Sequence, residues 1–299
     1  MAAARKIKKY SLSKPCVCLF VDHNRRAEHL ARAFIAGLCR HAVYFKVKPA
    51  CEYKGDLLGD IAVFYGLRGP LFQVYQDYRK NHRTTVFIDL GYWGRHDGGR
   101  LAGYHRVVVN GFQPTAYFQN KSHDGSRFDQ LHISLENAKR QQGDAILLAG
   151  MSEKSAGIYG LRAEEFERRT ISILSYLSSR EIIYRPKPSW TAARPLPKTH
   201  YSPPQETLAA ALQKSWCVVT HHSNVAIDGL LAGRPCIVLG DGVGKAIGSQ
   251  DLTSIEKPYY PDEMTLRQFC YDLAWTQWKP DEIKHGDCWE YLRQDNLIE

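Results

Sequence analysis

Residues 216–242 read WCVVTHHSNVAIDGLLAGRPCIVLGDG, and this stretch decides the fold. Residues 216–220 are a short apolar, β-branched run, which is typical of a buried strand. Residues 223–232 carry apolar side chains at helical spacing and end at Gly233, a residue typical of helix C-termini. Residues 235–239 form a second apolar run. Strand, helix and strand in so little chain predict a βαβ unit with parallel strands.

The turn between the first strand and the helix, His221-His222-Ser223-Asn224, carries the chemistry of this stretch. Ser and Asn are preferred helix N-caps, and the free amides that follow an N-cap favour an anion. We therefore predict that the turn holds the phosphates of a nucleotide. The alternative is an N-cap with structural histidines; a metal site is disfavoured because adjacent histidines on a strand point apart and no third ligand is evident.

Asp228 follows Asn224 by one helical turn and shares a face with it. A carboxylate at this position would bind a ribose diol. The alternative is a solvated helix residue.

The same alternation of strand and helix runs through the chain. Strands are predicted at 14–22, 42–47, 60–67, 84–90, 104–110, 144–149 and 181–185, with helices between most of them. The pattern predicts an α/β protein with two Rossmann-like doubly wound domains that face a cleft. The pattern weakens at 111–142, so we expect an acceptor-binding domain at 1–140. Residues 141–299 would form a nucleotide-binding domain with C-terminal helices.

Composition limits the choice of partner and compartment. The 299 residues include 40 Lys+Arg and 31 Asp+Glu, a net charge of +9, which favours a nucleotide, nucleic acid, anionic glycan or membrane surface. No apolar run approaches the ~20 residues of a membrane span. The basic N-terminus lacks the apolar core of a secretory signal, and the eight cysteines form no CxxC pair. We expect a cytoplasmic protein with reduced cysteines.

Other predicted strand ends also carry candidate ligand-binding residues. Gly150-Met151-Ser152 offers small residues and backbone amides to a phosphate, although a plain strand-to-helix connection is equally consistent. Lys187 lies between two prolines in RPKP, and a rigidly held cation there suits a diphosphate; the alternative is a surface lysine. Residues 240–245 are rich in glycine but lack the Ser or Thr of a Walker motif, which favours a flexible loop.

In the first half, Asp22 and Asp89 end predicted strands. A carboxylate at a strand end is a candidate general base, although each alone is more often a turn or capping residue.

Several of these segments resemble GT-B glycosyltransferases. SNVAIDGLLAGRPCIVLG (223–240) resembles their donor-binding segment, RPKP their basic-Pro element and GDAILLAG (143–150) the start of their donor domain. The closing YDLAWTQWKPDEIKHGDCWEYL (271–292) resembles the tails of capsule-type, Kdo-transferase-like enzymes and of related phage-encoded proteins. The segments IDLGYWGR (88–95) and YHRVVVNGFQPT (104–115) look most like the phage-type members.

The resemblance implies a hexosyltransferase-like enzyme that uses a nucleotide-sugar, with UDP as the expected nucleotide, and needs no metal or other cofactor. Asp89 or Asp22 would deprotonate the acceptor. The donor would be bound by Gly150, Ser152, Lys187, His221, His222, Ser223, Asn224 and Asp228. The sequence departs from the common pattern, because Asp228 stands where Glu is usual and RPKP where His-Pro is often found.

The phage-type likeness and the positive charge together suggest a hydroxymethylated pyrimidine in phage DNA as the acceptor. Such an enzyme would bind backbone phosphates and flip the base out of the duplex. Phosphate contacts are expected from Arg25, Arg26, Arg95, Arg100 and Lys121, with His96 nearby, and base stacking from Tyr92 and Trp93. The alternative for Tyr92 and Trp93 is that they pack at the interface between the two domains, and this alternative is favoured for Trp93. Two other functions stay open: a transferase of capsule or lipopolysaccharide synthesis, and a non-catalytic nucleotide- or DNA-binding protein.

Overall fold

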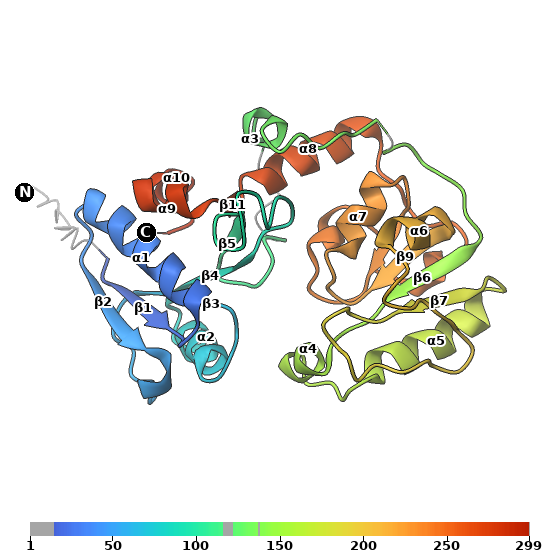
Figure 1. Ribbon diagram of the computed structural model, residues 1–299, viewed down its shortest axis with the longest axis horizontal. Helices are drawn as coiled ribbons and strands as arrows, with labels where there is room; N and C mark the ends of the chain where they lie inside the picture. The colour runs from blue at the N-terminus through green and yellow to red at the C-terminus, as the bar shows by residue number, and fades with distance from the viewer. Residues whose placement is uncertain (1–14, 116–121, 137, 299) are drawn as a thin grey trace, which may run out of the picture. The chain divides into compact units, whose positions relative to one another are not determined.

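The computed structural model describes residues 15–115, 122–136 and 138–298; the predicted acceptor residue Lys121 lies outside them. The chain forms two compact units. The first comprises Met1–Gly111 and Trp278–Glu299, and the second comprises Phe112–Gln277. Figure 1 labels most of their helices and strands.

The first unit is built on a six-stranded sheet in the order β11-β5-β4-β3-β1-β2. Strands β1 to β4 pair in parallel, and β5 runs antiparallel to β4. The strands are β1 (Val17–Val21), β2 (Phe45–Pro49), β3 (Ile61–Tyr65), β4 (Thr84–Leu90), β5 (His105–Val109) and β11 (Gln277–Trp278). The helices are α1 (Arg25–Arg40), α2 (Leu71–Lys80), α9 (Pro280–His285) and α10 (Asp287–Gln294), with the short η1 (Ala50–Glu52).

The second unit has a five-stranded, fully parallel sheet in the order β10-β9-β6-β7-β8. Its strands are β6 (Ala145–Ala149), β7 (Ile182–Arg185), β8 (His200–Tyr201), β9 (Ser215–Thr220) and β10 (Cys236–Val238). Its helices are α3 (Ser126–Asp129), α4 (Glu153–Ile158), α5 (Glu165–Leu177), α6 (Leu208–Gln213), α7 (Val225–Leu231) and α8 (Glu263–Ala274), with η3 (Val243–Ala246) and η4 (Leu252–Ser254). The predicted βαβ unit is confirmed as β9-α7-β10, and so is the α/β class with two parallel-sheet domains.

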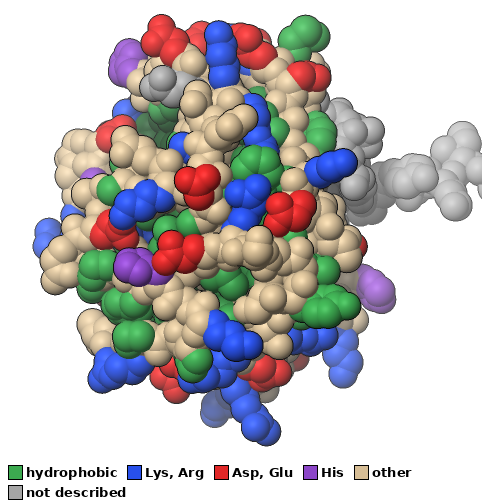
Figure 2. Space-filling model, turned by 90° about the vertical axis from the view of Figure 1, so that its right-hand side faces the viewer, with side chains coloured by type: hydrophobic (Ala, Val, Ile, Leu, Met, Phe, Trp, Pro, Cys, Tyr) green, Lys and Arg blue, Asp and Glu red, His purple; other side chains and the backbone are tan. Residues whose placement is uncertain are grey.

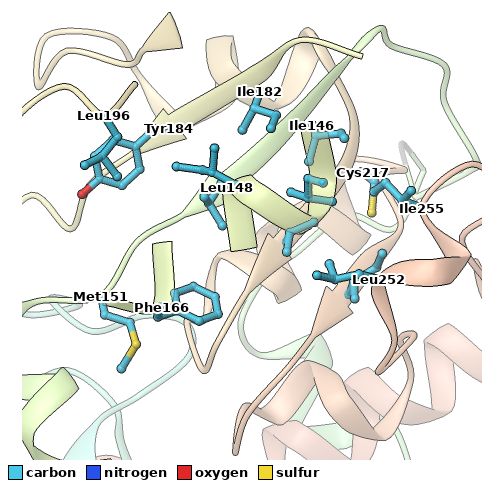
Figure 3. Close-up of a cluster of buried hydrophobic side chains, with 14 of the residues drawn as sticks. Ile146, Leu148, Met151, Phe166, Ile182, Tyr184, Leu196, Cys217, Leu252 and Ile255 are labelled. Atoms are coloured by element: carbon cyan, nitrogen blue, oxygen red, sulfur yellow. The ribbon is translucent and has the colours of Figure 1, made fainter. Parts of the chain in front are cut away.

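One cluster of the core of the second unit lies between its sheet and α5. Ile146 and Leu148 of β6 and Tyr184 of β7 are fully buried, and Leu174 of α5 packs against them. Figure 3 shows these strand side chains with Cys217 of β9 in the same cluster. A parallel strand covered on both faces is expected to be apolar throughout, as β6 is (AILLA).

The division into units differs from the expected boundary at residue 140. His123 lies on Asp272 of α8, with Nδ1 and Oδ1 2.8 Å apart, and the rings of Phe128 and Tyr271 are 5.8 Å apart, so this segment belongs to the second unit. The C-terminal helices belong to the first unit, because α9 packs against α1. Gly37 permits that approach, since a Cβ there would lie 2.3 Å from the carbonyl oxygen of Ile283.

Within the described part of the chain, no helix combines the length and the apolar character needed to cross a membrane.

Candidate functional site

The sheet of the second unit reverses its direction of growth between β6 and β9. From β6 the chain adds β7 and β8 on one side, and then returns to add β9 and β10 on the other. Ligands of open parallel sheets bind at such a switch point, beyond the carboxyl ends of the two strands. Here those ends are Ala149 and Thr220, which pair with each other. We name the loops that follow β6, β7, β9 and β10 the donor edge.

A buried carboxylate accepts a hydrogen bond from the backbone of the loop after β6. Glu167 of α5 is 1% exposed, and its Oε1 accepts a hydrogen bond from the Met151 N–H at 2.5 Å. Burial raises the pKa of Glu167. Gly150 is required at this turn, because a Cβ would lie 2.8 Å from the Tyr184 ring and 3.0 Å from Glu167 Oε1. Ser152 caps α4 by accepting from the Ser155 N–H at 3.3 Å.

In the loop after β9, several amides at the start of α7 are already hydrogen-bonded, contrary to the expectation that they are free. The Ser223 N–H donates to Thr220 Oγ1 at 3.2 Å, and the Val225 N–H donates to Ser223 Oγ at 3.3 Å. The Ala226 N–H donates to the Ser223 carbonyl at 3.2 Å. Three amides are therefore used within the turn, and α7 is only seven residues long. The Asn224 side chain caps no amide of α7.

His221 and His222 form a hydrogen-bonded pair whose Nδ1 atoms are 3.2 Å apart. The ring of Tyr159 lies against both, at centroid distances of 4.6 Å from His221 and 4.9 Å from His222. His221 also contacts Phe166 edge-on at 5.4 Å, and burial lowers its pKa. Gly240 lies directly against the His221 ring, since a Cβ would be 2.2 Å from Cε1.

The RPKP element separates into a structural cation and an exposed one. Arg185 donates to Ser202 Oγ at 2.7 Å and to the Glu206 carbonyl at 2.9 Å, so it fixes the chain after β8. Lys187 is exposed and follows the end of β7. Asp228 is half-buried one turn into α7, where its N–H donates to the Asn224 carbonyl at 3.4 Å. Because β9, β6 and β7 are neighbours in the sheet, the predicted donor-binding residues follow adjacent strands at the donor edge.

The first unit has its own switch point, between β1 and β3. Asp22 lies in a turn at this point, where its carboxylate accepts hydrogen bonds from the His23 N–H at 2.9 Å and from Asn24 Nδ2 at 3.0 Å. Arg26 of α1 crosses the switch point, donating to the Tyr65 hydroxyl at 3.4 Å and to the Arg100 carbonyl at 2.6 Å. The second contact holds the backbone at Arg100, and Arg26 also brings positive charge to this edge.

Asp89 ends β4 and is paired with a residue of the antiparallel strand beside it. Arg106 Nη2 lies 2.9 Å from Asp89 Oδ2, and the Leu90 N–H donates to Asp89 Oδ1 at 2.8 Å. The Asp89 side chain stays 36% exposed. Because β5 is antiparallel, its first residues, His105 and Arg106, lie opposite Leu90 and Asp89. His105 is fully buried, and this burial lowers its pKa to about 4.

The structure contradicts the prediction that Tyr92 and Trp93 stack on a base. Tyr92 and Trp93 are only 4% and 9% exposed, so neither offers a face to a base. Arg95 donates to the Tyr92 carbonyl at 3.2 Å, whereas Arg25 and His96 are exposed. Acidic and basic side chains are interspersed on the face seen in Figure 2. Among the residues described, no three His, Cys, Asp or Glu side chains gather as metal ligands would.

Sequence reasoning missed four residues that the structure brings to these edges: Tyr159, Glu167, His105 and Arg106. Tyr159 and Glu167 act through tertiary contacts that no motif records. His105 and Arg106 were read only as part of a strand, and their position at the edge depends on the antiparallel direction of β5.

No protein-family model and no curated protein matches this sequence. Solved structures do match. KpsC of Thermosulfurimonas dismutans, described as a β-Kdo 2,4 transferase, has a TM-score of 0.54 at 14% identity, over 86% of this chain and 89% of that one. A KpsC β-Kdo 2,7 transferase of the same organism has a TM-score of 0.52 at 11% identity, over 94% and 99%. This chain therefore has a two-domain GT-B fold similar to that of these Kdo transferases.

Proposed function

We propose that the protein is a glycosyltransferase that moves a sugar from a nucleotide-sugar to a hydroxyl acceptor. The observation that carries the proposal is the donor edge: the reversal of strand order between β6 and β9, with polar side chains grouped around it. Gly150 keeps the loop after β6 close to the sheet. Lys187, His222 and Asn224 then supply a cation and hydrogen-bonding groups for a phosphate.

Lys187 is the residue we assign to the leaving nucleotide. Breaking the bond between the sugar and the phosphate leaves negative charge on the nucleotide. A fixed cation that meets this charge lowers the barrier, and such electrostatic stabilisation is usually the largest catalytic contribution. Pro186 and Pro188 restrict the backbone on both sides of Lys187. Asp228, half-buried on α7, is assigned to the ribose.

We assign Asp89 as the general base that removes the proton of the acceptor hydroxyl. Arg106 and the Leu90 N–H hold its two oxygens, while more than a third of the side chain remains open to solvent. Asp22 is the second candidate, but both of its oxygens are engaged in the turn before α1. An oriented carboxylate with an open approach is the better base.

For the acceptor, we favour a surface glycan over DNA. The two solved enzymes of similar fold are named as transferases of Kdo, a sugar. The DNA hypothesis depends on net charge and on aromatic stacking, and burial of Tyr92 and Trp93 removes the expected stacking faces. A hydroxymethylated pyrimidine therefore remains the second acceptor to test.

Mass spectrometry of an acceptor panel tests the proposal. The chain is incubated with mixed nucleotide-sugars and with capsule-type oligosaccharides, hydroxymethylated duplex DNA and plain duplex DNA. We expect a mass increase on an oligosaccharide, and its loss with Asp89→Asn. A mass increase on hydroxymethylated DNA alone would reverse the choice of acceptor. No transfer to any acceptor and no nucleotide-sugar binding would contradict a transferase.

A further inference from the structure

Three arginines precede strands of the second sheet at the edge opposite the donor edge. Arg140 comes before β6, Arg180 before β7 and Arg234 before β10. These strands run parallel, so their amino ends lie along one edge of the sheet. The Cζ atoms of Arg140 and Arg180 lie 4.5 Å and 4.1 Å from the ring centroid of Trp216, which is in β9. We name Arg140, Arg180 and Arg234 the arginine cluster.

The charges of the arginine cluster are only partly balanced. Arg180 Nε lies 3.2 Å from Glu256 Oε2, and Arg180 Nη1 donates to the Asp144 carbonyl at 3.3 Å. Among the residues described, no carboxylate forms an ion pair with Arg140 or Arg234. The cluster therefore holds two guanidinium charges that are not paired within the described part of the chain.

Buried N–H groups of the same two guanidiniums lack acceptors. Arg234 is 6% exposed and donates through Nη2 to the Gln213 carbonyl at 3.0 Å, but its Nε and Nη1 have no hydrogen-bond partner among the described residues. Nη1 of Arg140 is buried and unpartnered in the same sense, although the residue as a whole is half-buried and reaches solvent. A buried donor that is left unpaired lowers stability, and more so when it belongs to a charged group. These N–H groups therefore favour an anionic acceptor.

The backbone holds Arg140 beside the turn that carries Arg234. The Gln141 N–H donates to the Gly233 carbonyl at 2.8 Å, and a Cβ on Gly233 would lie only 2.0 Å from the Lys139 carbonyl oxygen. Burial lowers the pKa of Arg234, and the positive charge of Arg140 lowers it further, because the two guanidiniums are near each other. Both still carry their charge at neutral pH. The two cations are thus fixed as neighbours by the chain on either side of them.

We propose that Arg140 and Arg234 form a second anion site, which binds a phosphate group. A phosphate group carries about two negative charges at neutral pH, enough to balance both guanidiniums, whereas one carboxylate balances only one. Phosphate oxygens also fit the planar N–H fork of arginine. The ion approaches from the side of Arg140, the more exposed of the two. The site lies at the amino ends of the strands, so it is distinct from the donor edge and does not depend on the proposed function.

Thermal unfolding of the full chain in millimolar inorganic phosphate tests the proposal, with sodium chloride of equal ionic strength as the reference. A ligand of the native state raises Tm, and we expect phosphate to raise it by about 3 °C or more above the reference. Arg140→Gln should abolish this rise. Without phosphate, Arg140→Gln should have a Tm equal to or above that of the wild type, because Arg234 loses a neighbouring like charge. Glucose 1-phosphate, tested in parallel by calorimetric titration, distinguishes a phosphate ester from the free ion by its tighter binding.

Two variants separate this site from its alternatives. Arg169→Gln makes the same change of charge at an exposed position of α5 and should keep the phosphate effect. Lys187→Ala removes the cation of the donor edge and should keep it as well. An equal rise of Tm in Arg140→Gln and the wild type would overturn the proposal. Loss of the rise in Lys187→Ala would place the phosphate at the donor edge and would overturn it too.

Hydrogen–deuterium exchange locates the bound ion without any substitution. We expect inorganic phosphate to slow exchange at residues 139–141 and 233–235. Slowing confined to the loops of the donor edge would contradict a second site. UDP binding is measured separately, so a protein that binds phosphate at the arginine cluster but no UDP would count against the transferase proposal alone.

Discussion

Gly240→Ala is the substitution that most directly probes the packing of the donor edge. The added Cβ would lie 2.2 Å from Cε1, 2.4 Å from Nδ1 and 2.6 Å from Nε2 of His221. Carbon atoms in contact are separated by about 3.5 Å or more, so the ring must retreat by over ~1 Å. Tyr159 and Phe166 pack on that ring, and its Nδ1 is bound to His222, so its movement disturbs all three neighbours.

The expected loss follows from these contacts. Overpacking of this kind lowers the free energy of unfolding by about 1–3 kcal/mol, which corresponds to a fall of several degrees in Tm. Displacing the histidine pair should also weaken UDP binding about tenfold, or ~1.4 kcal/mol. Gly240 has no positive φ, so the result reports side-chain crowding and not backbone strain.

Gly157→Ala is the matched control. Gly157 lies in α4, is exposed, and has nothing within 4 Å of an added Cβ. Alanine should leave UDP affinity unchanged and raise stability by up to ~1 kcal/mol, because glycine is the poorer helix former. Thermal unfolding and calorimetric titration measure both variants. A Gly240→Ala protein with the Tm and the UDP affinity of the wild type would refute the packing described here.

Four further predictions concern Lys187, Asp89, His105 and Glu167. Lys187→Ala should weaken UDP binding and slow transfer without lowering Tm. Lys257 is exposed elsewhere on the second unit, so Lys257→Ala should leave the UDP affinity measured by calorimetry unchanged. Equal effects of the two substitutions would refute a specific role for Lys187. Asp89→Asn should reduce the transfer rate by about 100-fold or more while UDP affinity is kept, and an unchanged rate in a transfer assay would exclude this base. The pKa of His105 is lowered from 6.5 to about 4, so the wild type should lose stability as the pH falls from 6.5 towards 4. His105→Leu should lack that loss when urea unfolding is compared at pH 5 and 7. An equal change in the free energy of unfolding between these pH values in both proteins would contradict the lowered pKa of His105. Burial raises the pKa of Glu167, so its stabilising contribution is lost as the pH rises above about 4.5. In urea unfolding, the stability of Glu167→Gln relative to the wild type should therefore increase between pH 5 and 8. A stability difference that does not change with pH would contradict the raised pKa.

The features that sequence predicted best are local ones. The unit β9-α7-β10 was evident from apolar runs bounded by Gly233 and Pro235, because strand and helix periodicity are properties of neighbouring residues. The residues of the donor edge were also placed at strand ends, where parallel pairing brings them together.

Features that depend on distant contacts were not predictable. The apolar run of β5 gives no sign of its direction, yet its antiparallel pairing is what places Arg106 on Asp89. The hydrogen bonds from the Ser223 and Val225 amides to Thr220 Oγ1 and Ser223 Oγ depend on turn geometry, so nothing in the sequence indicates that these amides are already used within the turn.

Hydrogen–deuterium exchange of the full chain with and without saturating UDP is the most direct test of the donor assignment. We expect UDP to slow exchange in the loops after β6, β7, β9 and β10, with the strongest protection at residues 221–225, and to leave α1 and α2 unchanged. Protection confined to the first unit, or no change in residues 221–225 on binding, would contradict the account.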